Sequence, residues 1–185
     1  MKKYRDLREH LRALEDEGLL QRVSRPINKD TELFPLVRWQ FRGGMTEEQR
    51  RGWLFENVTD SRGKKYPHPF ALGVLASSRK IYAVGLGCRD EEEILAKWQR
   101  ALSNPIPPVM VETGPVHEIV LNTEALSKPG AGFESFPVPI STPGFDNGPY
   151  LTWSHWVTKD PETKIRNLGN YRAQVKSPTR LGISL

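Results

Sequence analysis

A short segment near the carboxy-terminal end, residues 167–174, combines residue types that could hold an anionic cofactor through a metal ion. The guanidinium of Arg172 is a rigid fork that can donate two parallel hydrogen bonds to a phosphate or a carboxylate. The side-chain carbonyl of Asn167 is a hard oxygen ligand of the kind that Mg²⁺ and Mn²⁺ prefer. Gly169, between them, lets the backbone approach a ligand closely. On composition alone, the segment fits an exposed polar β-strand better than a site.

Other polar groups are weaker candidates for chemistry. His155 alternates with Trp153 and Val157 on one face of a predicted strand, so we expect a hydrogen-bonded histidine beside the core rather than a ligand or a base. Asp160 and Glu162 lie in a proline-containing polar segment typical of a hairpin turn, which makes them poor acid and base candidates. The sequence contains no HExxH, CxxC, GxSxG or phosphate-loop pattern.

Composition narrows the class of protein. The chain has 185 residues, of which 37% are hydrophobic and 26% charged, as in ordinary globular domains. Its net charge is +5, but Lys and Arg are spread among acidic residues, so a basic nucleic-acid-binding module is the weakest of the functions considered. The single cysteine excludes an internal disulfide and suits a reducing compartment. With no apolar signal core and no long apolar run, we expect a cytoplasmic protein without a membrane partner.

The helices and strands around this segment can be predicted from the spacing of apolar residues and from the residues that begin and end helices. An amphipathic helix is predicted over residues 4–17, and further helices between Asp30 and Gly43 and between Asp90 and Asn104. Asp90 with Glu93 resembles a capping box. Short apolar runs predict strands over residues 19–23, 53–58 and 70–75.

A proline-rich stretch, residues 105–108, marks a change of pattern toward strands. Strands are predicted over residues 109–111, 116–121, 151–157 and 167–175. We therefore expect an α/β domain over residues 1–112 and the first strands of a mainly β domain over residues 113–185, an α+β chain overall.

The last of these strands poses a geometric problem for a shared site. Asn167 and Arg172 are separated by an odd number of residues, so a regular strand would place them on opposite faces. A bulge or twist is needed if both groups hold one ligand, and Gly169 is the expected place for it.

Four blocks of sequence carry a resemblance to a known family. They are residues 136–139, 146–152, 158–163 and 167–174. In order and spacing they resemble the UbiD-type prenylated-flavin-dependent decarboxylases and carboxylases, and the first helix with its following strand is similar as well. The resemblance covers the chain but only the front portion of the family's usual length. It implies that residues 113–185 begin a split-barrel, flavin-binding domain that is incomplete here.

The resemblance also implies roles for individual residues. Asn167 would bind a divalent metal, Mn²⁺ or Mg²⁺, that bridges to the cofactor phosphate, and K⁺ is a further cofactor of the family. Asn170, Tyr171 and Arg172 would contact prenylated FMN. Arg172 would also be catalytic, since it would hold the substrate carboxylate near the flavin. Lys164 departs from the family, which commonly has Gly there, and this affects turn geometry more than cofactor binding.

The implied reaction interconverts an aromatic or α,β-unsaturated carboxylic acid with its decarboxylated product and CO₂. The family's further His and Glu metal ligands and its proton-transfer acid have no counterpart before Leu185, so we expect the chain alone to be inactive. We expect the complete enzyme to be a homo-oligomer, dimer or hexamer, or to gain the rest of its site from a partner chain. A flavin prenyltransferase would supply the cofactor. The alternative is a non-catalytic structural or assembly subunit that pairs through its β segment, because unpaired strand edges need covering.

Overall fold

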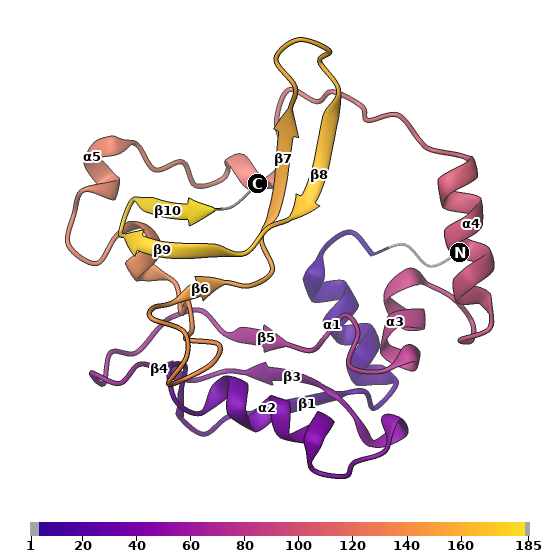
Figure 1. The fold of residues 1–185 in the computed structure, drawn as a ribbon, viewed down its shortest axis with the longest axis horizontal. Helices are drawn as coiled ribbons and strands as arrows, with labels where there is room; N and C mark the ends of the chain where they lie inside the picture. The colour runs from indigo at the N-terminus through magenta and orange to yellow at the C-terminus, as the bar shows by residue number, and fades with distance from the viewer. Residues whose placement is uncertain (1–3, 184–185) are drawn as a thin grey trace. The chain divides into compact units, whose positions relative to one another are not determined.

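The computed structural model describes residues 4–183 and contains helices and several small sheets, as predicted for a mixed chain (Figure 1). The chain divides into two compact units. The first unit comprises Met1–Arg25, Val37–Glu56 and Pro69–Val120, and the second comprises Pro26–Leu36, Asn57–His68 and Leu121–Leu185. Each unit is therefore assembled from segments that are distant in sequence.

The first unit begins with helix α1, Leu7–Asp16, which Asp6 caps by accepting a hydrogen bond from the Glu9 backbone N–H. The helix ends before Gly18, whose φ of +65° lies in the left-handed region that glycine adopts without strain. Helix α1 packs on α3, Arg79–Leu86, an element that was not predicted. The core between them is apolar and consists of Leu14, Leu19, Val74 and Ile81.

A three-stranded sheet completes the centre of this unit. Strand β3, Gly52–Phe55, lies between β1, Leu20–Val23, which is parallel to it, and β5, Phe70–Leu72, which is antiparallel. Helix α4, Glu93–Ser103, starts as predicted, because Asp90 Oδ1 accepts a hydrogen bond from the Glu93 N–H at 3.2 Å. A 3₁₀ turn covers Glu47–Gln49. Helix α2, Leu33–Arg42, runs from the second unit into the first.

All described strands after residue 121 belong to the second unit. Strands β6, Tyr150–Leu151, β9, Ala173–Ser177, and β10, Arg180–Ile183, form an antiparallel sheet in the order β10-β9-β6. Strands β7, His155–Lys159, and β8, Arg166–Asn170, form a separate hairpin. The short strands β2, Ile27–Asn28, and β4, Val58–Thr59, pair in parallel. Short helical turns cover Pro115–His117 in the first unit and Thr123–Leu126 (α5) and Gly132–Ser135 in the second. None of the described sheets closes into a barrel.

Two predicted strands are absent from the described residues. Residues 109–111 and 116–121 join no sheet, and their side chains are exposed, as at Val109 (84%) and Val116 (83%). The apolar pattern was correct, but a strand also needs a partner for its backbone ladder, and no described segment provides one. Three other predicted strands are each divided in two, at residues 56–57, 152–154 and 171–172.

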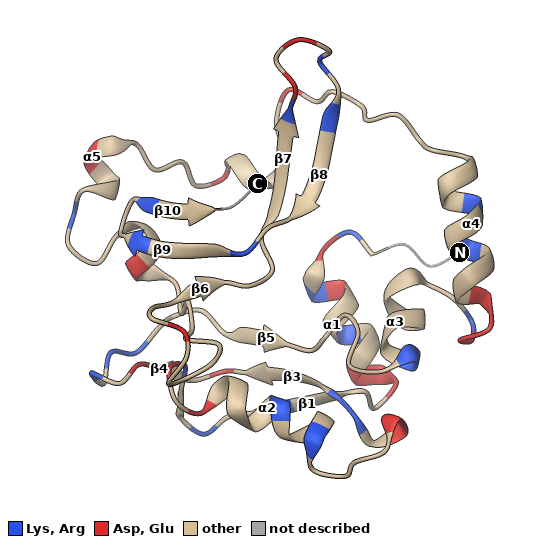
Figure 2. Cartoon of the chain, in the orientation of Figure 1, with Lys and Arg blue, Asp and Glu red and all other residues tan. Residues whose placement is uncertain are grey.

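Charge is mixed along the whole described chain. Figure 2 shows Lys and Arg interspersed with Asp and Glu over helices, strands and loops, apart from a short acidic run, residues 90–93, at the start of α4. Between residues 4 and 183, no helix has the length and apolar character needed to cross a membrane.

Candidate functional site

The hairpin of β7 and β8 presents the first half of the predicted site. Asn167 lies opposite Thr158 in the ladder, and Asn170 lies opposite His155. The turn between the strands is the predicted one, because Asp160 Oδ1 accepts hydrogen bonds from the backbone N–H groups of Glu162 and Thr163. These bonds, from Thr163 first and then from Glu162, lower the pKa of the Asp160 carboxyl. Asp160 therefore shapes the turn.

The chain leaves this hairpin at Tyr171 and Arg172 and enters the other sheet as β9. The carbonyl of Tyr171, which is outside both ladders, accepts hydrogen bonds from Ser154 Oγ at 3.0 Å and from Trp156 Nε1 at 2.9 Å. The predicted irregularity thus exists, but its predicted position at Gly169 was wrong. Gly169 pairs regularly with Trp156.

Gly169 has another function, which is to make room for the ring of Tyr171. A Cβ atom at residue 169 would lie 2.3 Å from Tyr171 Cε2, far inside van der Waals contact. The ring reaches back along the strand, and Asn167 Nδ2 donates a hydrogen bond to the Tyr171 hydroxyl at 3.2 Å. Asn167, Gly169 and Tyr171 therefore form one group on one side of β8.

Arg172 is held separately from this group. Its Nη2 donates to Asp146 Oδ2 at 2.9 Å, and its guanidinium lies 4.1 Å from the centre of the Tyr150 ring. The same Asp146 oxygen accepts a hydrogen bond from the Thr142 N–H at 2.8 Å. The cation–π contact and the ion pair together orient the guanidinium. Asp146 and Tyr150 were not among the predicted site residues, although both lie in the second block that carried the resemblance.

The described residues thus bring Asn167 and Tyr171 together, give Arg172 its own partners, and leave Asn170 exposed at the end of β8. No hydrogen bond within the described residues occupies the side-chain carbonyl of Asn167, so this oxygen fits the role of a ligand to a hard cation. Residues 4–183 contain no group of three His, Cys, Asp or Glu arranged to hold a metal ion. Asn167 would accordingly supply one ligand of a larger set.

The surroundings of His155 differ from the predicted ones, in which this side chain lay beside the core. The residue is exposed, and so are its neighbours on the predicted core face, Trp153 (57%) and Val157 (71%). Leu168 on the adjacent strand is 65% exposed. The alternation was read correctly, but the described residues place nothing over this apolar face of the hairpin.

Comparisons with known proteins show which family the chain resembles. Residues 109–185 match the family model described as UbiD, 3-octaprenyl-4-hydroxybenzoate carboxy-lyase Rift-related domain. A protein of Aquifex aeolicus (strain VF5) is 30% identical in an alignment 204 positions long. This alignment covers 98% of this chain and 38% of that protein.

Solved structures give the same result. The UbiD-class enzyme HmfF from Pelotomaculum thermopropionicum, in complex with FMN, is 31% identical with a TM-score of 0.77, and the match covers 97% of this chain and 36% of HmfF. An evolved dimeric form of HmfF in complex with prFMN is 30% identical with a TM-score of 0.79, covering 98% and 38%. Vanillic acid decarboxylase of Sedimentibacter hydroxybenzoicus, in its closed form, is 28% identical with a TM-score of 0.79, covering 99% and 37%.

The chain spans less than two-fifths of the length of these relatives. The matched part includes every residue of the predicted site. The match of residues 109–185 to the UbiD family model, and the likeness of the whole chain to part of several UbiD-class structures, are consistent with the amino-terminal portion of a UbiD-type protein.

Proposed function

We propose that this chain is the front portion of a non-oxidative decarboxylase or carboxylase that acts on an aromatic or α,β-unsaturated carboxylic acid with prenylated FMN and a divalent metal. The observation that carries the proposal is the orientation of Arg172 by Asp146 and Tyr150 within a fold shared with flavin-bound UbiD-class structures. The proposed metal is Mn²⁺ or Mg²⁺, with K⁺ as a further ion.

Arg172 has the donors for the proposed role. A guanidinium has five N–H groups, and Arg172 donates one hydrogen bond, from Nη2 to Asp146, with no second acceptor for it among residues 4–183. The other donors suit the planar, bidentate geometry of a carboxylate or a phosphate. Arg172 would orient the acid, and the carboxylate of Asp146 would keep the guanidinium in place before the substrate arrives.

Asn167 and Tyr171 would form the cofactor side of the site. The free carbonyl oxygen of Asn167 would bind the cation, while the hydrogen bond from its amide nitrogen to Tyr171 would fix the orientation of the amide. Asn170, exposed at the end of β8, would contact the flavin together with Tyr171 and Arg172. When bound, the flavin would supply the electron sink that is needed because loss of CO₂ leaves negative charge on an sp² carbon.

The remaining ligands and the proton-transfer acid would come from residues that correspond to the rest of the relatives' length, in a homo-oligomer or from a partner chain. We place the protein in the cytoplasm, with a flavin prenyltransferase as the source of its cofactor. In the test, the protein in its complete assembly is reconstituted with prenylated FMN and Mn²⁺. Flavin content and CO₂ exchange with a panel of aromatic and acrylic acids are then measured. We expect stoichiometric flavin and exchange with at least one acid; an assembly that retains no flavin would refute the proposal.

A second candidate function is a non-catalytic structural or assembly subunit. The apolar face of the β7 and β8 hairpin and the exposed residues 106–121 favour it, because such surfaces are normally covered by another chain or segment. Co-purification of a larger polypeptide in a complex without flavin absorbance would support this candidate and contradict the first.

A further inference from the structure

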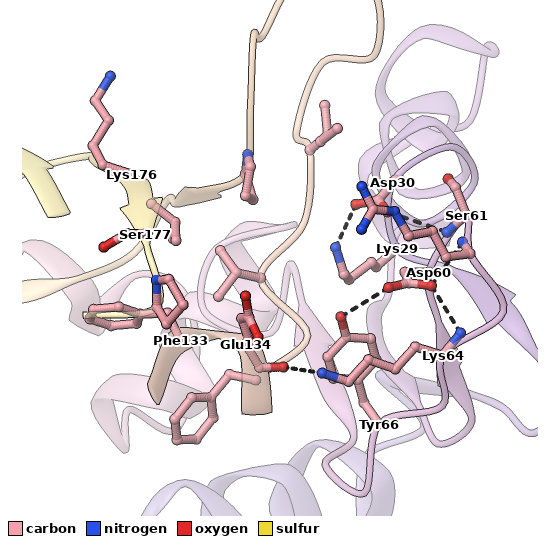
Figure 3. Close-up of a pocket in the computed structure, with 17 residues that line it drawn as sticks. Lys29, Asp30, Asp60, Ser61, Lys64, Tyr66, Phe133, Glu134, Lys176 and Ser177 are labelled. Carbon is pink, nitrogen blue, oxygen red and sulfur yellow. Dashed lines mark hydrogen bonds and ion pairs between the residues drawn. The ribbon is translucent and has the colours of Figure 1, made fainter. Parts of the chain in front are cut away.

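A separate cavity lies within the second unit, and neither Asn167 nor Arg172 lines it. Its volume is about 480 Å³, within the range of small-molecule sites. One wall comes from Lys29 and Asp30, which follow β2, and from the loop of residues 60–66, which follows β4; the opposite wall comes from residues 133–149 and 175–178. Figure 3 shows Lys29, Asp30, Asp60, Lys64 and Tyr66 on one side, and Phe133, Glu134, Lys176 and Ser177 on the other.

Lys29 is the buried cation of the polar wall. Only 7% of the residue is exposed, yet within residues 4–183 its ammonium makes a single hydrogen bond, to Asp30 Oδ1 at 2.6 Å. It also lies 5.8 Å from the centre of the Tyr66 ring. An ammonium has three donors, so two remain for an acceptor in the cavity. A buried charge without such acceptors is costly, which favours a ligand oxygen at this position.

The carboxylates of the wall are already occupied. Asp60 accepts bonds from the N–H groups of Arg62 and Lys64, both at 2.9 Å, and from the Tyr66 hydroxyl at 3.3 Å. Asp30 pairs with Lys29 and accepts a weaker bond from the Ser61 N–H at 3.4 Å. Asp60 therefore accepts three hydrogen bonds and Asp30 two, of the roughly four that a carboxylate can accept, whereas the cations of the wall retain more unused donors.

Two further cations lie on the same wall. The side chain of Arg62 makes no hydrogen bond or ion pair with the described residues, although the cavity includes it. Lys64 Nζ donates to the Glu134 carbonyl at 2.6 Å and lies 5.0 Å from the centre of the Tyr66 ring. Lys176 also lines the cavity, but its ammonium extends away from the others (Figure 3). The polar wall therefore offers uncommitted donors from Lys29 and Arg62.

The opposite wall is mostly apolar, although Lys176 and Ser177 also belong to it. Its apolar side chains are Phe133, Phe136, Val138, Ile140, Pro149, Val175 and Pro178. Glu134 is the one carboxylate on this wall, and its side chain is exposed. A ligand that used both walls would need an anionic head and a hydrocarbon body.

We propose that this cavity binds a small organic acid, with its carboxylate on Lys29 and Arg62 and its apolar body against Phe136 and Val138. The site shares no residue with the segment from Asn167 to Arg172, so the inference stands apart from the proposed function. Neither a bare inorganic anion nor a neutral hydrocarbon would satisfy both walls.

The test measures calorimetric binding of hexanoate to the protein in its complete assembly. Hexanoate is saturated and aliphatic, so it does not belong to the substrate class proposed for the flavin site. We expect saturable one-site binding, together with shifts of the Tyr66 and Phe133 ring resonances in NMR spectra. Neutral hexanamide and inorganic phosphate should each bind at least about tenfold more weakly, since each lacks one of the two contacts.

Lys29→Met should weaken hexanoate binding by roughly tenfold to a hundredfold, as expected for loss of a charge-assisted hydrogen bond. Because Lys29 is buried beside Asp30, this variant can also lose stability, so Arg62→Met provides a second variant at an exposed position. It should weaken binding by about threefold or more. Lys65→Met, which removes a neighbouring exposed lysine outside the cavity, is the control and should bind normally.

Equal affinity in Arg62→Met and Lys65→Met would overturn the proposal. So would hexanamide binding as tightly as hexanoate, or hexanoate binding that leaves the Tyr66 and Phe133 resonances unchanged. If an assembly that lacks flavin binds hexanoate with these shifts, the proposed organic-acid site is supported. The proposed function is then judged by its own test, the flavin content and CO₂ exchange.

Discussion

The ring of Tyr171 lies directly on Gly169, so close that a Cβ atom at residue 169 would be 2.3 Å from Tyr171 Cε2. Replacing glycine by alanine in a strand normally stabilises it, but here the added methyl group must displace the ring. We expect Gly169→Ala to lower the free energy of unfolding by about 1–3 kcal/mol. It should also weaken flavin binding, because Asn167 loses its partner. Chemical unfolding and flavin absorbance measure the two effects.

The control for this variant is the same change in a Tyr171→Ala background. Without the ring, the alanine at residue 169 has room, so its cost should largely disappear. An equal loss of stability in both backgrounds would show that the ring contact is not the cause.

Asp146 is expected to act as a positioning residue for Arg172. Asp146→Asn keeps the size of the side chain and removes its charge, so we expect a fall in kcat/KM for decarboxylation of about tenfold in the complete enzyme. The free energy of unfolding should fall by only about 1 kcal/mol, because the Arg172 side of the ion pair is 45% exposed, although Asp146 is 13% exposed, and asparagine keeps an oxygen for the Thr142 N–H. Steady-state kinetics and urea unfolding measure both quantities. Glu162→Gln, in the hairpin turn, is the control and should leave both unchanged; unaltered kinetics in Asp146→Asn would remove its assigned role.

The turn of the β7 and β8 hairpin contains a strained residue. Lys164 has a φ of 62°, the left-handed region, and is the only residue other than glycine with positive φ between residues 4 and 183. Lys164→Gly should therefore raise the free energy of unfolding by about 0.5–1 kcal/mol. Lys159→Gly, within β7, should lower it by a similar amount because glycine weakens a strand. The same sign of change in both variants would contradict this account.

Tyr66 provides a prediction about alkaline pH. Burial first, and then the neighbouring charge of Asp60, raise the pKa of the Tyr66 hydroxyl from 10.0 to about 12. A raised pKa favours the neutral phenol in the folded protein, so its contribution to stability is complete below pH 10 and is lost between about pH 10 and 12. Absorbance titration near pH 11, between the two pKa values, should show close to one phenolate fewer from Tyr66 in the native protein than in the unfolded protein. Tyr66→Phe should remove this part of the difference and leave the part due to Tyr4, whose pKa burial also raises. A native Tyr66 that titrates near pH 10 would be inconsistent with its burial and its contact with Asp60.

Local signals predicted much of the fold. Helix α1 ends before Gly18, and α4 begins with the contact between Asp90 and Glu93, because both features depend on residues close in sequence. The hairpin turn at Asp160 is confirmed for the same reason. The strands predicted over residues 109–121 failed because a ladder depends on a distant partner, which no local pattern specifies.

In the candidate site, too, features that depend on nearby residues were predicted and features that depend on distant residues were not. The segment from Asn167 to Arg172 was visible in the sequence as a set of residue types. The exit of the chain at Tyr171 was not, because it depends on hydrogen bonds from Ser154 and Trp156 in another strand. Asp146 reaches Arg172 across 26 positions of sequence, a contact that spacing alone does not reveal. The roles assigned to Asn167, Asn170, Tyr171 and Arg172 in cofactor binding remain predictions.

The central claim is that the Arg172 guanidinium holds the carboxylate that reacts. The direct measurement is the decarboxylation rate of Arg172→Ala in the complete enzyme, reconstituted with prenylated FMN and Mn²⁺. Arg180→Ala, which removes an exposed arginine on β10, is the matched control. We predict that turnover falls by at least about a hundredfold in Arg172→Ala and stays within about twofold in Arg180→Ala. Retained turnover in Arg172→Ala would contradict the account.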